Sequence, residues 1–133
     1  MNTSFKPSGY TSASPYFIVE DAHRFIELMK QIFDARELRT YHRPSGKIMH
    51  AEVQIDDSVI MLADATENYP AETIVMHVYV PDTDTVFQKA IAAGCEAIDS
   101  PKSQEGDPDR RGTFKDFAGN LWSVGTQMSD SEL

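Results

Sequence analysis

Three polar side chains that can do chemistry occupy alternate positions in one short stretch of the sequence. The stretch KIMHAEVQIDDSVIMLAD, residues 47–64, carries His50, Glu52 and Gln54. Successive side chains of a β-strand point to opposite faces, so residues two apart share a face. An imidazole, a carboxylate and an amide on one face are typical either of a solvated strand or of the wall of a cavity.

Three kinds of chemistry suit His50 and Glu52. Histidine can act as a general base that a neighbouring carboxylate orients. The same pair can ligate a metal ion, although two ligands make a weak site. Glu52 can also pair with a cationic ligand, whose binding would weaken as the pH falls and His50 becomes protonated. No nucleophile is evident nearby, because Cys95, the only cysteine, follows the predicted end of a helix.

The turn inside this stretch predicts which residues lie opposite one another. If residues 56–57 form a two-residue hairpin turn, the cross-strand pairs are Ile55 with Ser58, Val53 with Ile60 and Ala51 with Leu62. These mostly apolar side chains suit a face that a helix covers. His50, Glu52 and Gln54 then share the opposite face with Met61.

The chain repeats one pattern of elements about halfway along its length. A strand ending at Val19 and a strand ending at Val80, 61 residues later, each precede an amphipathic helix. Asp21 and Asp82 are the expected helix N-caps, and Gly94 is the expected stop of the second helix. Further strands are expected at 36–43, 47–55 and 58–64, and again at 96–100, 110–115 and 121–127, with a polar loop between the first two of the second set.

Each half therefore reads as βαβββ, and the fold class is α+β with two tandem modules. The modules span about residues 10–65 and 72–128 of a single domain that covers 1–133. A four-stranded sheet with one helix leaves its other face to be covered. Two copies can pair those faces and enclose an open-barrel cleft.

Paired βαβββ modules of this size resemble the vicinal oxygen chelate superfamily, which includes glyoxalase I, extradiol dioxygenases and bleomycin-resistance proteins. The segments HAEVQIDDSVIMLAD and DRRGTFKDFAGNLWSV are similar to its PhnB-like branch. The resemblance covers about residues 10–128. It implies the fold more strongly than a reaction, because this fold hosts many activities.

The resemblance also locates the four positions at which metal-dependent members hold a divalent ion. They fall at Ser14, Met61, Val75 and Ser123. None of these is a histidine or a carboxylate, and such side chains do not hold Mg²⁺, Mn²⁺, Ni²⁺ or Zn²⁺. We therefore expect neither a metal ion nor another cofactor.

Strand alternation extends the expected cleft into the second module. If Val75 marks the cleft face, His77 and Tyr79 share it. Ser123 marks the same face on the last strand, so Trp122 turns toward the helix as a core anchor.

A four-residue loop at 116–119 would pair Phe114 with Leu121 and turn Phe114 and Arg110 to the cleft. The predicted ligand-binding residues, all in one cavity, are His50, Glu52, Gln54, Met61, His77, Tyr79, Arg110 and Phe114.

Composition limits the partners. Twelve Lys and Arg against 21 Asp and Glu give a net charge of −9, which argues against binding to nucleic acid or an anionic membrane. The sequence shows no signal peptide and no apolar run of about 20 residues, so we expect a cytoplasmic protein. Exposed sheet edges favour a homodimer.

The expected function is metal-independent binding of a small molecule. By resemblance to bleomycin-resistance proteins, the protein would sequester a cationic or aromatic compound such as an antibiotic. The alternative is an enzyme of lyase, isomerase or dioxygenase type, which would use His50 and Glu52 in acid–base chemistry or a displaced metal at His50, His77 and Glu52. A fold relic with a structural or regulatory role is the third hypothesis.

Overall fold

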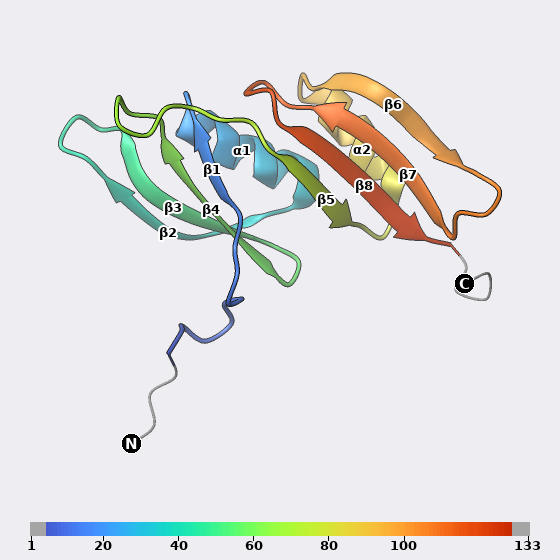
Figure 1. Ribbon diagram of the computed structural model, residues 1–133, viewed down its shortest axis with the longest axis horizontal. Helices are drawn as coiled ribbons and strands as arrows, with labels where there is room; N and C mark the ends of the chain where they lie inside the picture. Colours follow the sequence, from blue (N-terminus) through green and yellow to red (C-terminus); the bar gives the residue numbers. More distant parts are fainter. Residues whose placement is uncertain (1–4, 129–133) are drawn as a thin grey trace. The chain divides into compact units, whose positions relative to one another are not determined.

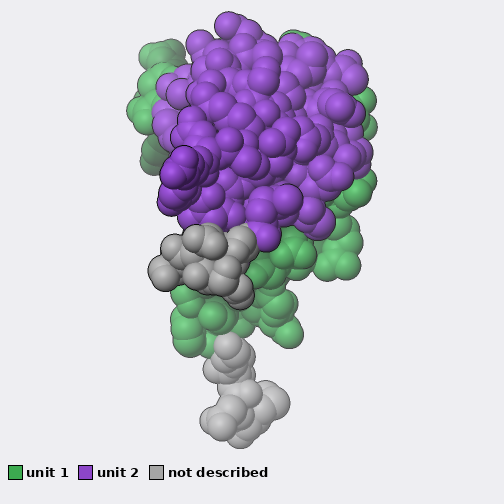
Figure 2. Space-filling model, turned by 90° about the vertical axis from the view of Figure 1, so that its right-hand side faces the viewer, with its two compact units in different colours: residues 1–72 green, residues 73–133 purple. Residues whose placement is uncertain are grey.

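The computed structural model describes residues 5–128, and the chain divides into two compact units, residues 1–72 and 73–133 (Figure 2). The elements of the first unit are β1 (Tyr16–Val19), α1 (Ala22–Phe33), β2 (Arg36–His42), β3 (Ile48–Ile55) and β4 (Ser58–Asp64). Those of the second unit are β5 (Val75–Tyr79), α2 (Thr83–Ala92), β6 (Glu96–Ser103), β7 (Asp109–Lys115) and β8 (Leu121–Gln127).

Both units have the same strand order, and this confirms the predicted duplication. The first sheet runs β1-β4-β3-β2 and the second β5-β8-β7-β6. The first strand of each unit pairs in parallel with its neighbour, β1 with β4 and β5 with β8. All other neighbouring strands in the two sheets are antiparallel. α1 packs against β1, β3 and β4, and α2 against β6, β7 and β8 (Figure 1). One helix thus covers one face of each sheet, and the α+β fold class is confirmed.

Both helices begin, and the second helix ends, where the sequence predicts. The side chain of Asp21 accepts a hydrogen bond from the backbone N–H of Arg24, and that of Asp82 accepts one from Thr85. Each cap satisfies a backbone donor that the first helical turn leaves without a partner. Gly94 follows α2 with a φ of +102°, a conformation that glycine adopts at low cost. No helix within residues 5–128 is long and apolar enough to cross a membrane.

The β3–β4 hairpin has the predicted register. Ala51 pairs with Leu62, Val53 with Ile60 and Ile55 with Ser58. The core between this sheet and α1 contains fully buried side chains from both, among them Phe17, Val19, Phe25, Met29, Val53 and Leu62. His50, Glu52 and Gln54 therefore lie on the face turned away from α1, which we call the open face of the first sheet.

The predicted register of β7 and β8 is wrong by one residue. Phe114 pairs with Trp122, not with Leu121, because the loop contains five residues, 116–120. Asp116 fixes this length, since one carboxylate oxygen accepts the backbone N–H groups of Ala118 and Asn120 and the other accepts Trp122 Nε1. A slip of one residue moves every side chain of a strand to the other face.

The strand β6 is longer than predicted. It continues to Ser103, through residues 101–103 that the sequence assigned to a loop. Pro101 is tolerated there because β6 is an edge strand, where a missing backbone N–H breaks no ladder. The pairing with β7 shifts register between Asp99 and Lys102, so the strand bulges near the proline.

Candidate functional site

A chain of hydrogen bonds crosses the open face of the first sheet. Tyr16 Oη lies 2.9 Å from His50 Nδ1, and His50 Nε2 lies 2.9 Å from Glu52 Oε2. Strand pairing brings these residues together, because Met61 on β4 lies beside both Tyr16 on β1 and Glu52 on β3. Alternation within β3 then places His50 on the same face as Glu52.

Glu52 is enclosed by a second set of partners. Tyr10, in the segment that precedes β1, donates its hydroxyl to Glu52 Oε1. Arg39 Nε lies 3.8 Å from the same oxygen, and the Arg39 guanidinium lies 5.2 Å from the centre of the Tyr10 ring. Only 3% of Glu52 is exposed, so its charge is met by protein groups rather than by water.

These contacts determine the protonation of the cluster. Burial by itself raises the pKa of Glu52, but the hydrogen bonds from Tyr10 and His50 and the nearby positive charges outweigh it and leave the pKa below its usual value. An ionised carboxylate only accepts hydrogen bonds, so His50 Nε2 carries the proton toward Glu52. In the neutral imidazole Nδ1 is then the acceptor, and Tyr16 donates to it.

A pocket of about 360 Å³ opens beside this cluster, within the first unit. Its lining is Tyr16, Ile18, Arg43, Met49, Ala63, Asp64, Thr66 and Tyr69. Met49 reaches it because the pairing of β2 and β3 shifts register between the pairs Tyr41–His50 and His42–Ile48, which leaves Met49 unpaired in a bulge. Tyr16 belongs both to the pocket and to the hydrogen-bonded chain.

The two charged side chains of the pocket differ in their surroundings. The Asp64 oxygens accept the backbone N–H groups of Ala22 and Ile48 at 2.8 and 2.7 Å, so Asp64 ties α1 and β3 to the end of β4. For the Arg43 guanidinium, the described part of the chain contains no hydrogen bond or ion pair. Arg43 is therefore the charged group that this pocket can offer to a ligand.

The second unit holds a separate polar cluster on the face of its sheet away from α2. His77 Nδ1 lies 3.0 Å from Ser123 Oγ, and the rings of His77 and Tyr79 meet edge to face at 4.7 Å. Tyr79 Oη donates to Asp109 Oδ2 at 2.9 Å, and Arg111 donates to the same oxygen at 3.2 Å. Burial and the charge of Arg111 hold the pKa of His77 below its usual value, although Asp109 opposes the shift.

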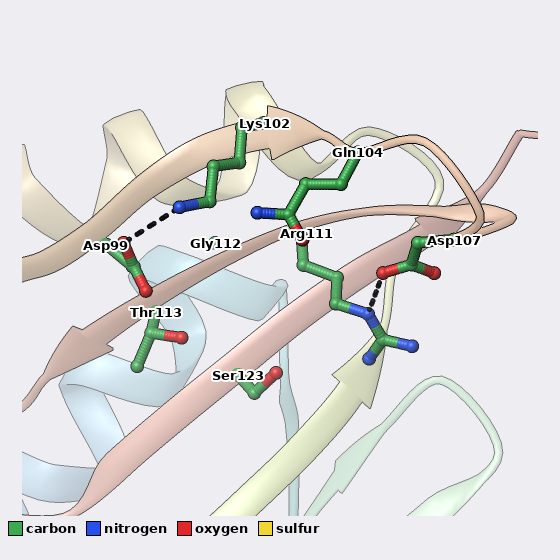
Figure 3. A pocket seen from close by; sticks show the side chains of 8 residues that line it. All are labelled: Asp99, Lys102, Gln104, Asp107, Arg111, Gly112, Thr113 and Ser123. Atoms are coloured by element: carbon green, nitrogen blue, oxygen red, sulfur yellow. Dashed lines mark hydrogen bonds and ion pairs between the residues drawn. The ribbon is translucent and has the colours of Figure 1, made fainter.

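A polar pocket of about 210 Å³ adjoins this cluster. Its charged side chains are already paired, Lys102 with Asp99 at 3.5 Å and Arg111 with Asp107 at 2.9 Å (Figure 3). Ser123 and Thr113 point into the space between the two pairs (Figure 3). A charged group of a ligand would therefore compete here with an internal ion partner.

Two predicted site residues lie on the helix-covered face instead of the open face. Phe114 is fully buried between Phe87 of α2 and Trp122, as the corrected register requires. Arg110 pairs with Asp84 in the first turn of α2, with Nε 2.8 Å from Oδ2. Neither side chain is placed to contact a ligand on the open face, and we leave both out of the candidate site. Trp122 is fully buried, so its predicted role as a core anchor is confirmed.

The other predicted residues lie on the open faces of their own sheets. His50, Glu52, Gln54 and Met61 belong to the first unit, where Gln54 accepts a hydrogen bond from Arg36 at 2.8 Å. His77 and Tyr79 belong to the second unit. That the two groups line one common cavity stays a prediction.

Sequence reasoning missed Tyr10, Tyr16, Arg39 and Arg43. A signal existed for Tyr16, because it follows Ser14 by two residues and so shares the face that Ser14 was taken to mark. No periodic pattern marks Tyr10, which lies outside any strand or helix.

The residues at the superfamily's metal positions do not fit a divalent ion. Ser14, Met61, Val75 and Ser123 offer two hydroxyls, a thioether and an alkyl group, whereas such ions need imidazole, thiolate or carboxylate ligands. Within residues 5–128, moreover, no group of three or more His, Cys, Asp or Glu side chains is placed to hold a metal. We therefore derive no chemistry through a metal ion.

Solved structures share this fold at low sequence identity. TioX from Micromonospora sp. ML1 superposes with a TM-score of 0.73 at 20% identity, over 87% of this chain and 99% of that one. The fosfomycin resistance protein FosX from Listeria monocytogenes, complexed with Mn(II) and sulfate, gives 0.70 at 16% identity over 92% and 93%. The PhnB protein from Bacillus cereus gives 0.67 at 17% identity over 87% and 99%.

Sequence comparison reaches closer relatives. An uncharacterised protein of Mycobacterium bovis is 31% identical over 131 residues, which cover 90% of this chain and 86% of the relative. One from Mycobacterium tuberculosis is also 31% identical, over 76% of its length. The pattern of the Glyoxalase/Bleomycin resistance protein/Dioxygenase superfamily matches residues 11–124. With the repeated βαβββ units, this match shows that the chain belongs to that superfamily.

Proposed function

We propose that the protein binds a small, partly aromatic molecule without a metal ion, in the pocket on the open face of the first sheet. The observation that carries the proposal is the composition of this pocket. Two tyrosines and the apolar side chains of Ile18, Met49 and Ala63 surround about 360 Å³, which is within the usual range for small-molecule sites. Aromatic rings offer a ligand a large contact area at small entropic cost.

Metal independence is supported by the side chains at the superfamily's metal positions. Restoring a divalent site there would need at least three substitutions, because three or four strong ligands are usual. Binding by shape and apolar contact needs none. A role in antibiotic resistance stays a prediction, since one fold hosts many activities.

The hydrogen bonds of Glu52 change the expected charge of the ligand. The sequence suggested a cationic compound paired with Glu52, but both carboxylate oxygens already accept hydrogen bonds from protein groups. Arg43 instead presents a guanidinium to the pocket. A ligand with an acidic group would complete its ion pair, and a basic ligand would be repelled.

A second candidate function is acid–base catalysis, which the His50–Glu52 hydrogen bond of 2.9 Å favours. A carboxylate that fixes one imidazole nitrogen leaves the other in the tautomer that can accept a proton. Three further properties stay proposals: the homodimer, the cytoplasmic location and the union of both units in one domain.

Metal analysis combined with a thermal-shift screen tests the binding proposal. We expect the purified protein to contain far less than one metal ion per chain. Aromatic compounds that bind should raise its unfolding temperature equally with and without EDTA, because binding to the folded state alone stabilises it. Stoichiometric metal, or shifts that EDTA abolishes, would refute metal independence.

A matched pair of variants locates the site. Met49→Ala removes an apolar wall of the pocket and should reduce the thermal shift. Met128→Ala removes an exposed methionine that directly follows β8 in the second unit and should leave the thermal shift unchanged. Equal effects of the two substitutions would place the ligand elsewhere.

A further inference from the structure

We propose that Tyr16, His50 and Glu52 form a proton relay, through which the Tyr16 hydroxyl exchanges a proton with the molecule in the adjoining pocket. The inference rests on the proposed use of this pocket by a small molecule and adds an activity to it. Tyr16 is the reacting group, His50 its base, and Glu52 the group that orients the base.

Geometry carries the inference. The three groups are joined by two contacts of 2.9 Å in the order hydroxyl, imidazole, carboxylate. Exposure to solvent differs between the two ends of the relay, since Glu52 is 3% exposed and Tyr16 is 43% exposed. The reactive end of the relay therefore opens to the pocket, and the orienting end is shielded from water.

Before any reaction, only one placement of the protons on Tyr16 and His50 satisfies both hydrogen bonds of the relay. His50 Nε2 donates to the Glu52 carboxylate, and Tyr16 donates to the lone pair on Nδ1. Burial and the charge of Glu52 raise the pKa of Tyr16, although Arg43 opposes them. The phenol is thus protonated at rest, and its proton leaves only as a new bond forms at the oxygen.

The step balances without a further reactant. A bound molecule X–H gives its proton to Tyr16 Oη while the phenolic proton moves to His50 Nδ1. The electron pair of the X–H bond stays on X as an anion, and the imidazolium is stabilised by Glu52. The reverse transfer returns the proton to X, at the same atom or at a conjugated one.

The surroundings indicate which molecules fit. Arg43 lines the same pocket as Tyr16, so a negative charge that develops on the substrate meets a guanidinium in a partly apolar site. The substrate class is an aromatic molecule with an acidic C–H or O–H next to a carbonyl group. Tyr10 and Arg39 contact only Glu52 and each other among these groups, and act as positioning residues.

Reaction with an aromatic sulfonyl fluoride tests the relay without a known substrate. With phenylmethanesulfonyl fluoride, a bond forms between Tyr16 Oη and sulfur, the S–F bond breaks with loss of fluoride, and the phenolic proton passes to His50. Tyr69 is the internal control, because it lines the same pocket and is 68% exposed, but no imidazole of the described residues is hydrogen-bonded to its hydroxyl. Peptide mass spectrometry over time gives the labelling rate of each tyrosine.

We expect Tyr16 to react at least about tenfold faster than Tyr69, because general-base assistance contributes about 10²–10⁴-fold in enzymes. His50→Gln should reduce the rate at Tyr16 at least about tenfold and leave Tyr69 unchanged. Equal rates at Tyr16 and Tyr69 in the wild-type protein would overturn the relay, and this comparison needs no variant to fold. So would equal Tyr16 labelling in a folded His50→Gln protein.

The two proposals fail in different experiments. If aromatic compounds stabilise the protein but Tyr16 reacts no faster than Tyr69, the relay is wrong and the binding site stands. If Tyr16 reacts fast but no compound stabilises the protein, the relay stands as a reactive group and the proposed binding function fails.

Discussion

At the residue scale, Glu52 shows how a buried charge can be kept in a small protein. An unpaired buried carboxylate is costly, and the site avoids this cost with hydrogen bonds from Tyr10 and His50 and a nearby Arg39. The same contacts tie the segment before β1 to the centre of β3. Glu52 therefore links the stability of the first unit to the arrangement of its candidate site.

Replacing Glu52 by Gln should destabilise the folded protein by about 1–3 kcal/mol at neutral pH, because an amide cannot accept both hydrogen bonds without placing its own donor against one of them. The folded-state pKa of Glu52 lies below the unfolded value, so the ionised carboxylate favours folding above that unfolded value. The advantage over the variant should shrink as the pH falls below about 4.5, the unperturbed pKa.

Chemical denaturation of both proteins from pH 7 to pH 3 measures this difference. Glu20→Gln is the control, because Glu20 is exposed and its side chain makes no hydrogen bond or ion pair with the described residues. A constant stability difference between wild type and Glu52→Gln across this pH range would show that the ionisation of Glu52 does not stabilise the fold.

Arg43 should set the charge preference of the pocket. Phenylacetate is expected to bind more tightly than benzyl alcohol, and benzylamine more weakly than either. Arg43→Gln should weaken phenylacetate binding about tenfold, since a charged hydrogen bond is worth about 1.5–3 kcal/mol, and should leave benzyl alcohol little changed. Lys115→Gln removes the same charge from the second unit and is the control in NMR titrations. Tighter binding of benzylamine than of phenylacetate would contradict the assignment.

At the element scale, the length of the β7–β8 loop determines which side chains of these two strands face α2 and which lie on the open face. Asp116→Ala would leave the buried Trp122 Nε1 and two backbone N–H groups without their acceptor. We expect a loss of about 3 kcal/mol in the free energy of unfolding. Asp57→Ala, in the exposed turn of the β3–β4 hairpin, should cost less than about 0.5 kcal/mol. Equal costs in urea denaturation would show that Asp116 does not hold the loop.

The two hairpins also show how far the sequence predicts this fold. The β3–β4 pairs follow from alternation and a two-residue turn, and they are correct. The β7–β8 pairs are wrong because a side chain, not the backbone pattern, sets the loop length. His50 and Glu52 were found by their spacing, and Tyr16 could have been found in the same way. Tyr10 could not, because its contact with Glu52 joins an irregular segment to a strand 42 positions away.

At the scale of the whole molecule, each sheet leaves edge strands that no other strand of the described chain pairs. The edge strands are β1 and β2 in the first sheet and β5 and β6 in the second, and symmetric association is the commonest way to cover such edges. We expect sedimentation equilibrium to give about twice the chain mass of 14.9 kDa at micromolar concentrations. A mass that stays at the single-chain value over this range would argue for a monomer.

The most direct test of metal-independent binding is an NMR titration of the ¹⁵N-labelled protein with phenylacetate. The protein is first freed of metal ions with EDTA, and the titration is then repeated after Mg²⁺ that contains no Mn²⁺ has been added. Binding in the proposed pocket should shift the amide signals of Ile18, Met49 and Thr66, which come from three separate parts of the first unit. The affinity should be the same with and without the ion, since no metal ligand takes part. Shifts confined to the second unit, or binding that appears only after Mg²⁺ is added, would contradict the account.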